Sequence, residues 1–137
     1  IKDFKISDKN KTYKIGTSDR ILSGDGKTIV AVSPVISGEF TDSSVTAVGK
    51  GAFSHNTNIT SVVMDKVTVI GDYGFASDKS LTSISFGKLA SIGNYAFFES
   101  SLTVMPEITS ETKIGKYAFS YYDDVTYNYS CHKQGAS

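Results

Sequence analysis

The hexapeptide Ile92-Gly93-Asn94-Tyr95-Ala96-Phe97 decides the fold of this chain, because close copies of it recur at a constant spacing. The other copies are VGKGAF from Val48, IGDYGF from Ile70 and IGKYAF from Ile114, so that each copy starts 22 residues after the one before. A period of about 20 to 50 residues is typical of solenoids, in which each repeat forms one coil. The spacing therefore predicts a stack of about four coils.

A second block of apolar and polar residues lies between successive copies of the hexapeptide. The sequences ITSV from Ile59 and LTSI from Leu81 carry apolar residues at their first and fourth positions, and Met64 and Phe86 supply the sixth. This is the strand pattern of leucine-rich repeats. Because a further apolar pair precedes each hexapeptide glycine, we expect two short extended runs in each coil. The predicted fold is mainly β, a leucine-rich-repeat solenoid of about four coils with an amino-terminal β cap.

Two residue types recur at fixed positions of the hexapeptide. The glycines are expected at a corner of each coil, in a left-handed or a tightly approached backbone conformation: Gly49, Gly71, Gly93 and Gly115. The phenylalanines are the largest residues at any fixed position, and we expect them to stack as a buried ladder: Phe53, Phe75, Phe97 and Phe119.

Residues 1–44 do not follow the period. Polar turns at Asp8-Lys9-Asn10 and at Gly24-Asp25-Gly26 separate apolar runs, which predicts two hairpins. Because a solenoid must cover its first coil, we interpret residues 1–44 as capping strands, residues 45–129 as the repeats and residues 130–137 as a tail. In the third repeat the strand block starts one residue early, at Leu102, and Pro106 follows it, so we expect a local distortion there.

Composition argues against several partners. The 137-residue chain has 14 Lys and Arg against 14 Asp and Glu, so it lacks the electrostatic field that draws proteins to nucleic acid. No stretch approaches the roughly 18 apolar residues of a membrane span, and we expect no membrane insertion of this segment. The chain begins at Ile1, and we expect it to be a piece of a longer protein.

The blocks LTSI from Leu81 and IGNYAF from Ile92 resemble the BspA-like leucine-rich repeats, and the resemblance covers about residues 45–127. Repeats of this type occur on surface and secreted proteins of oral and gut bacteria and in some protists. The resemblance implies a secreted or cell-surface location and a protein partner, such as host extracellular matrix or the surface of another cell. Where the family often carries a cysteine after the Ala-Phe step, this chain has other residues, so nothing about the packing of that cysteine carries over.

No residue pair has both the spacing and the partners of a catalytic site. Cys131 and His132 are adjacent, and adjacent residues of a strand point to opposite faces. His55 has no second histidine at ligand spacing. We therefore predict that the protein is not an enzyme and has no metal or other cofactor.

A cluster near the carboxy terminus supports a second interpretation. Asp123 and Asp124 follow Tyr121 and Tyr122, and carboxylates beside aromatic residues occur in sugar-processing sites. A carbohydrate-binding domain centred on this cluster is one alternative to the protein-recognition module. A structural spacer that holds another domain away from a surface is the other.

The candidate binding face consists of the strand residues that point away from the core, together with tyrosines near the carboxy terminus. By the strand pattern these are Thr60, Ser61, Val63, Thr82, Ser83, Ser85, Thr103, Val104 and Pro106, with Tyr121, Tyr122, Tyr127 and Tyr129 at the carboxy-terminal end. Tyrosines are frequent hot spots in interfaces, so we expect contacts to concentrate at that end. The strand edge there is also expected to pair with a second chain, which predicts self-association.

Overall fold

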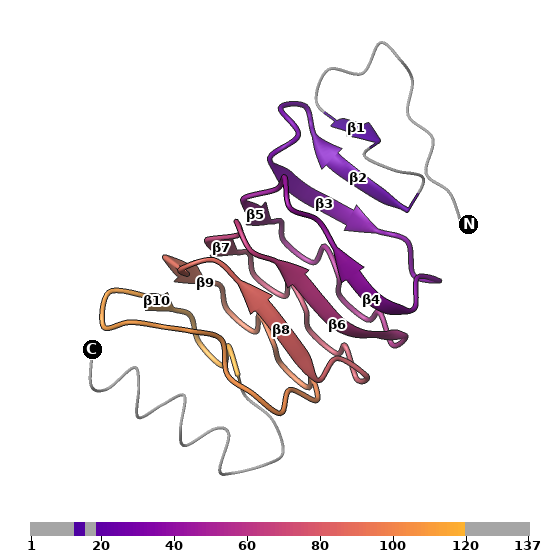
Figure 1. Ribbon diagram of the computed structural model, residues 1–137. Coiled ribbons are helices and arrows are strands. Elements are labelled where there is room, and N and C mark those ends of the chain that lie inside the picture. The colour runs from indigo at the N-terminus through magenta and orange to yellow at the C-terminus, as the bar shows by residue number, and fades with distance from the viewer. Residues whose placement is uncertain (1–12, 16–18, 120–137) are drawn as a thin grey trace.

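The computed structural model describes the backbone of residues 13–15 and all atoms of residues 19–119. In this part of the chain the regular elements are all strands, and they wind into the coils of a β-solenoid (Figure 1). Two sheets run along the stack on opposite sides of a common core. The mainly β solenoid that the repeats predict is confirmed.

The larger sheet combines the cap with one short strand from each coil. Its seven strands have the order β1-β2-β3-β5-β7-β9-β10. Their bounds are β1 Tyr13–Ile15, β2 Arg20–Ser23, β3 Thr28–Val32, β5 Ala47–Val48, β7 Val69–Ile70, β9 Ser91–Ile92 and β10 Lys113–Ile114. The first three strands pair antiparallel, and from β3 onward the pairing is parallel. The last residue of each of the four short strands is the first residue of a hexapeptide, so the period of 22 residues sets the register.

The smaller sheet has three parallel strands, β4 Gly38–Thr41, β6 Ile59–Met64 and β8 Ser83–Phe86. In β6 the first, fourth and sixth residues are buried and the others are not, as the strand pattern predicts. Parallel stacking on this side already begins with β4, which lies within the segment that the sequence analysis assigned to the cap. Its Phe40 is buried opposite Val62, in the inward-pointing register.

The predicted hairpin at Gly24-Asp25-Gly26 joins β2 to β3. Asp25 Oδ1 accepts hydrogen bonds from Ser23 Oγ at 2.6 Å and from the Lys27 N–H at 2.9 Å, and Gly26 has a φ of 74°. These contacts explain why an aspartate is favoured in this turn. The hairpin predicted at Asp8-Lys9-Asn10 lies outside the described residues.

An arginine joins the cap to the first strand of the smaller sheet. The guanidinium of Arg20 donates to both carboxylate oxygens of Asp19, at 2.7 and 3.1 Å, to Asp42 Oδ2 at 3.0 Å and to the Thr41 carbonyl at 3.0 Å. Its Cζ atom lies 4.0 Å from the ring centroid of Phe40. Burial raises the pKa of Asp42, but hydrogen bonds from Ser44 and Arg20 outweigh it and lower that pKa. The ion pair therefore fixes how the cap sits on the coils.

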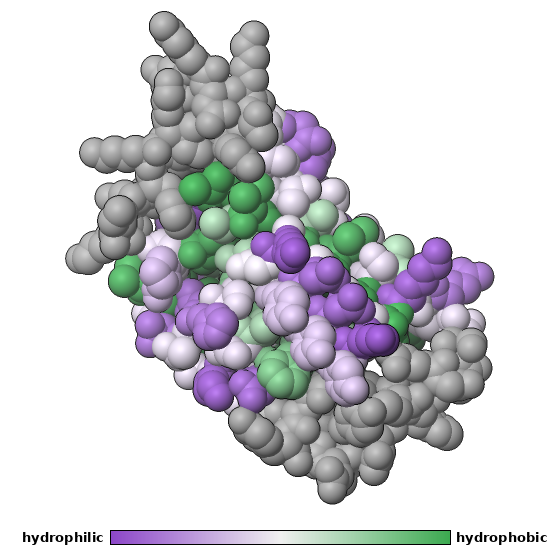
Figure 2. All heavy atoms as spheres, turned by 180° about the vertical axis from the view of Figure 1, so that it is seen from behind, coloured by the Kyte–Doolittle hydropathy of each residue, from purple (hydrophilic) through white to green (hydrophobic). Residues whose placement is uncertain are grey.

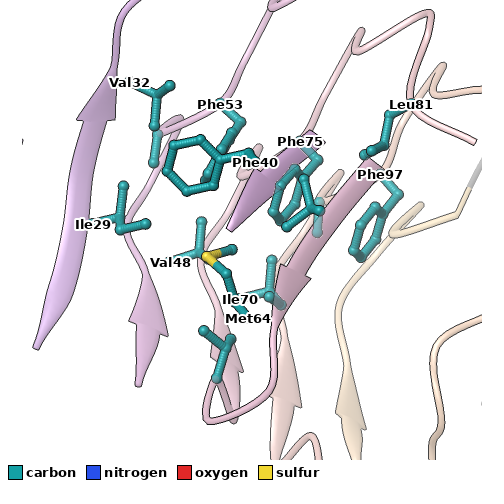
Figure 3. Packing of buried hydrophobic residues seen from close by; sticks show 14 of the residues in the cluster. Ile29, Val32, Phe40, Val48, Phe53, Met64, Ile70, Phe75, Leu81 and Phe97 are labelled. Atoms are coloured by element: carbon teal, nitrogen blue, oxygen red, sulfur yellow. The ribbon is translucent and has the colours of Figure 1, made fainter. Parts of the chain in front are cut away.

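The phenylalanine ladder forms the centre of the core (Figure 3). Its ring centroids are 4.6, 5.2 and 5.3 Å apart from the first ring to the last, and each ring is at most 2% exposed: Phe53, Phe75, Phe97 and Phe119. Phe40 packs edge-on against Phe53 at 4.9 Å and closes the ladder on the side of the cap. The predicted buried ladder is confirmed.

The third repeat is distorted, as its irregular spacing predicts. The chain has no strand in residues 93–112, so the described part of the smaller sheet ends at β8, although the Thr103 N–H still donates to the Thr82 carbonyl at 3.1 Å. Pro106 is buried, so its predicted place on the outer face is wrong. Proline has no N–H for a ladder, and here the chain leaves the strand path and turns the ring inward.

Backbone hydrogen bonds link the turns of successive coils. The N–H groups of Tyr73, Phe75 and Ser77 donate to the carbonyls of the next coil at 2.9, 2.7 and 2.7 Å: Asn94, Ala96 and Phe98. The preceding turn repeats the arrangement from Gly51, Phe53 and His55 to Asp72, Gly74 and Ala76. The turns thus form a third ladder beside the two sheets.

The hexapeptide glycines are needed for close approach between coils. A Cβ atom on Gly93 would lie 2.5 Å from the backbone nitrogen of Asp72, and one on Gly115 would lie 2.5 Å from that of Asn94. Of the two predicted reasons for these glycines, close approach of the neighbouring coil is correct and a left-handed backbone is not. The left-handed conformation falls two residues later, on Gly51, Tyr73, Tyr95 and Tyr117, with φ between 55° and 67°.

Candidate functional site

The predicted outward residues that the structure describes do lie at the surface, apart from Pro106. Thr60, Thr82, Ser83, Ser85, Thr103 and Val104 are exposed, and Ser61 and Val63 are half-buried. The four predicted tyrosines, Tyr121, Tyr122, Tyr127 and Tyr129, lie outside the described residues. So do Asp123, Asp124, Cys131 and His132.

Strand register arranges the outward residues of the smaller sheet in two rows. One row is Glu39, Ser61 and Ser83, and the other is Thr41, Val63 and Ser85. We call these six residues the strand face. Glu39 and Thr41 were missed by the sequence analysis because no hexapeptide precedes β4, although the pattern of a buried Phe40 between two polar residues could have indicated them.

Many of the hydroxyl groups near the strand face donate to acceptors of the protein itself. Ser61 Oγ donates to Glu39 Oε2 at 3.4 Å, and Ser85 Oγ donates to Asp65 Oδ1 at 2.7 Å. Beside the face, Thr82 and Thr103 donate to backbone carbonyls of the preceding coil at 3.4 and 3.0 Å. Because these hydroxyl protons are already hydrogen-bonded within the protein, the oxygen lone pairs and the carboxylates are what can accept hydrogen bonds from a partner. The strand face therefore mainly offers hydrogen-bond acceptors.

A second surface, which the sequence analysis missed, is a ladder of tyrosines on the turns. Tyr73 and Tyr95 stack with centroids 5.0 Å apart and planes 4° apart, and Tyr95 and Tyr117 stack at 5.4 Å and 27°. We call these three residues the tyrosine ladder. Tyr73 is 42% exposed and Tyr117 is 45% exposed, whereas Tyr95 between them is half-buried. The signal was present in the sequence, because tyrosine recurs at the fourth hexapeptide position.

A column of buried polar residues follows the phenylalanine ladder. It contains Asn56, Asp78 and Ser100, each three residues after a ladder phenylalanine. Asp78 Oδ1 accepts a hydrogen bond from the Asn56 N–H at 2.9 Å, whereas Oδ2 is buried without a partner. Burial raises the pKa of Asp78 to about 8, with only that one hydrogen bond to oppose it. Burial therefore favours the neutral form of this carboxyl, and its hydrogen bond links Asp78 to the preceding coil.

An open hollow of about 420 Å³ lies over β7, β9 and β10. Its polar rim includes Asp72, Asn94 and Lys113. The Oδ1 atoms of Asp72 and Asn94 accept hydrogen bonds from the backbone of the following coil, at 2.8 and 2.7 Å. These side chains hold the coils together, and the hollow has no converging set of free polar groups of the kind that orients a small ligand.

The described residues contain no group of three or more metal-ligating side chains. His55 is exposed, and its Nδ1 lies 2.9 Å from Ser54 Oγ. Among the same residues there is no helix with the length and apolar character needed to cross a membrane. Figure 2 shows hydrophilic and hydrophobic side chains interspersed over the described part of one side of the molecule.

Comparison with protein families identifies a repeat family. The BspA type leucine rich repeat region matches in six copies over residues 37–126. The matched region includes β4 and its Phe40, in agreement with the start of parallel stacking in the structure. Comparisons with curated proteins and with solved structures found no match.

Proposed function

Because this chain belongs to the BspA-type leucine-rich repeat family, we propose that it is the recognition module of a secreted or cell-surface protein and that its strand face binds a protein partner. A repeat solenoid generally serves as a non-enzymatic scaffold with an extended surface. The two rows of the strand face supply such a surface, since they repeat along the stack in register.

The supply of acceptors on the strand face carries the proposal. Ser61 and Ser85 direct their protons at Glu39 and Asp65, so these two hydroxyls and the two carboxylates present oxygen lone pairs and negative charge to a partner. The hydroxyls of Thr41 and Ser83 can also accept. A complementary partner presents N–H donors or cationic side chains, because charge complementarity fixes the register of an interface. An exposed protein segment with lysine, arginine or amide groups has this chemistry. Host extracellular matrix and the surface of another cell are the partners that we propose.

The proposal can be tested with paired charge substitutions. Ser83→Arg places a bulky cation on the strand face, and Ser110→Arg places the same cation in an exposed turn that contributes no residue to that face. We expect the first to weaken binding to immobilised extracellular-matrix proteins by at least about tenfold, as a like charge in an interface does, and the second to leave binding unchanged. Thermal unfolding of both variants controls for folding.

Two outcomes would contradict this function. If the unmodified protein binds no matrix or cell-surface protein in a broad panel, the spacer interpretation is favoured. If it binds and Ser83→Arg binds equally well, recognition takes place away from the strand face.

A further inference from the structure

We propose that the tyrosine ladder has a vacant first rung at Gly51, and that an aromatic side chain of the partner protein stacks there on the free face of Tyr73. The inference rests on the proposed protein-recognition function and adds a second contact site to it. It also specifies the chemistry of the group that the site accepts.

The repeat itself defines the rung. Gly51 occupies the hexapeptide position that is tyrosine in the three following copies. Its φ of 67° is close to the 57°, 58° and 55° of Tyr73, Tyr95 and Tyr117. The Gly51 N–H donates to the Asp72 carbonyl at 2.9 Å, as the Tyr73 N–H does to Asn94 in the next coil. The backbone at Gly51 is therefore placed as it is where a tyrosine stands.

The space above this backbone is open. A Cβ atom built on Gly51 would have no atom within 4 Å, whereas one built on Gly93 would collide with the neighbouring coil. Glycine at position 51 therefore leaves a gap where the other coils carry a ring.

The gap leaves one face of Tyr73 without a stacking partner. Tyr95 covers one face of Tyr73 at 5.0 Å, and within residues 19–119 no ring contact covers the other. Tyr95 is stacked on both faces, by Tyr73 and Tyr117, and it is half-buried. Tyr73 and Tyr117 themselves are more than 40% exposed. A ring seated on the free face would extend the ladder by one more stacked pair.

The surroundings favour an aromatic ring over a sugar. A stacked aromatic ring needs no hydrogen bonds at its edge, whereas a sugar needs polar groups for its hydroxyls. Two of the polar side chains nearest in sequence are engaged elsewhere: Asp72 Oδ1 accepts the Asn94 N–H at 2.8 Å, and Ser54 Oγ lies 2.9 Å from His55 Nδ1. The exposed Lys50 is a single donor, fewer polar groups than the several hydroxyls of a sugar require. Tyrosine, phenylalanine and tryptophan of a partner protein have the required chemistry, and such residues are enriched at interface hot spots.

Small probes test the rung directly by NMR. We expect N-acetyl-L-tyrosinamide to shift the ring signals of Tyr73 in a saturable way, because of its ring current. N-acetyl-L-leucinamide and methyl β-D-glucoside should leave these signals unchanged. Gly51→Tyr should abolish the shift by filling the rung from within the chain, and Gly51→Ala, which also removes a glycine but adds no ring, should retain it.

Partner binding provides a second measurement. Tyr73→Leu removes the aromatic platform and should weaken binding of a matrix protein captured by the unmodified domain about two- to tenfold, the usual effect of one aromatic pair. Gly51→Tyr should weaken it to a similar extent. The Phe97 ring signals report whether each variant is folded, and Tyr73→Leu keeps the test decisive if Gly51→Tyr does not fold.

The outcomes separate this inference from the proposed function. Shifts with the glucoside but not with the tyrosine derivative, or shifts that persist in Gly51→Tyr, would overturn the vacant rung. If Ser83→Arg abolishes partner binding while Tyr73→Leu and Gly51→Tyr leave it unchanged, the proposed function stands and the rung is refuted as a partner site. If no protein partner binds, the proposed function fails, and with it the partner's aromatic side chain as occupant.

Discussion

Replacing Asp78 with asparagine should change how the stability of the protein depends on pH. Asp78 is fully buried, its Oδ1 accepts one hydrogen bond from the Asn56 N–H, and its Oδ2 has no partner. Asparagine has nearly the same shape and keeps the Oδ1 acceptor, but it cannot ionise. The substitution therefore removes the titration and leaves the packing in place.

The structure sets the direction and the upper limit of the effect. Burial raises the pKa of Asp78 from 3.8 to about 8 in the folded protein. Between these values the unfolded chain binds fewer protons than the folded one, so the free energy of unfolding falls as the pH rises. Each unit of pKa difference corresponds to about 1.4 kcal/mol, and the full window therefore corresponds to about 6 kcal/mol at most. Below pH 4 the effect vanishes, because the carboxyl is protonated in both states.

Urea unfolding followed by circular dichroism at several pH values between 4 and 8.5 measures this effect. We expect Asp78→Asn to match the unmodified protein near pH 4 and to exceed it by several kcal/mol near pH 8. The other ionisable groups contribute equally to both proteins and cancel in the difference. A difference between the two proteins that is constant across this range would refute a neutral, buried Asp78.

Substitutions at three further positions test the packing. Phe97→Ala should cost about 3 to 5 kcal/mol of unfolding free energy, because it removes a fully buried ring between two stacked neighbours; a loss below about 1 kcal/mol in chemical denaturation would contradict the ladder. Arg20→Ala should cost about 1 to 2 kcal/mol, because it removes the guanidinium from the half-buried Asp42, and Arg20→Lys, which lacks the planar fork, should recover part of that loss in thermal unfolding. Gly93→Ala should cost about 3 kcal/mol or more, since its methyl group would lie 2.5 Å from the backbone of Asp72; a melting temperature equal to that of the unmodified protein would show that the coils separate easily.

The fold could be predicted from the sequence because each of the four hexapeptide copies places a phenylalanine at the same position of its coil. A phenylalanine every 22 residues stacks on its counterparts only if the coils lie one above another, so Phe53 through Phe119 determine the stack. The same logic applied to tyrosine, and the tyrosine ladder could have been predicted from Tyr73, Tyr95 and Tyr117. It was missed because residues that recur at a fixed repeat position were expected only in the core.

Other features could not be predicted from local patterns. Glu39 joins the strand face through its register with Ser61, which depends on how the chain returns after the cap hairpin. Asp78 looks like an ordinary turn residue in the sequence, and its burial depends on the coils above and below it. The clash that excludes a side chain at Gly93 likewise comes from the neighbouring coil. Each of these depends on distances between coils that no single repeat encodes.

The ladder of hydrogen bonds between the turns makes this one side of the solenoid electrically polar. Within the turn, the peptide units before Tyr73, Phe75 and Ser77 all direct N–H toward the next coil, and their carbonyls accept from the coil before. In a β-sheet such dipoles largely cancel, but here they add from coil to coil, as they do along an α-helix. The negative pole of this column faces the cap and the positive pole faces the carboxy-terminal end. An anion is therefore favoured at the carboxy-terminal end of the turns and a cation at their cap end. The effect is local to the turns, because the N–H groups of Thr68, Gly71 and Thr82 point the opposite way.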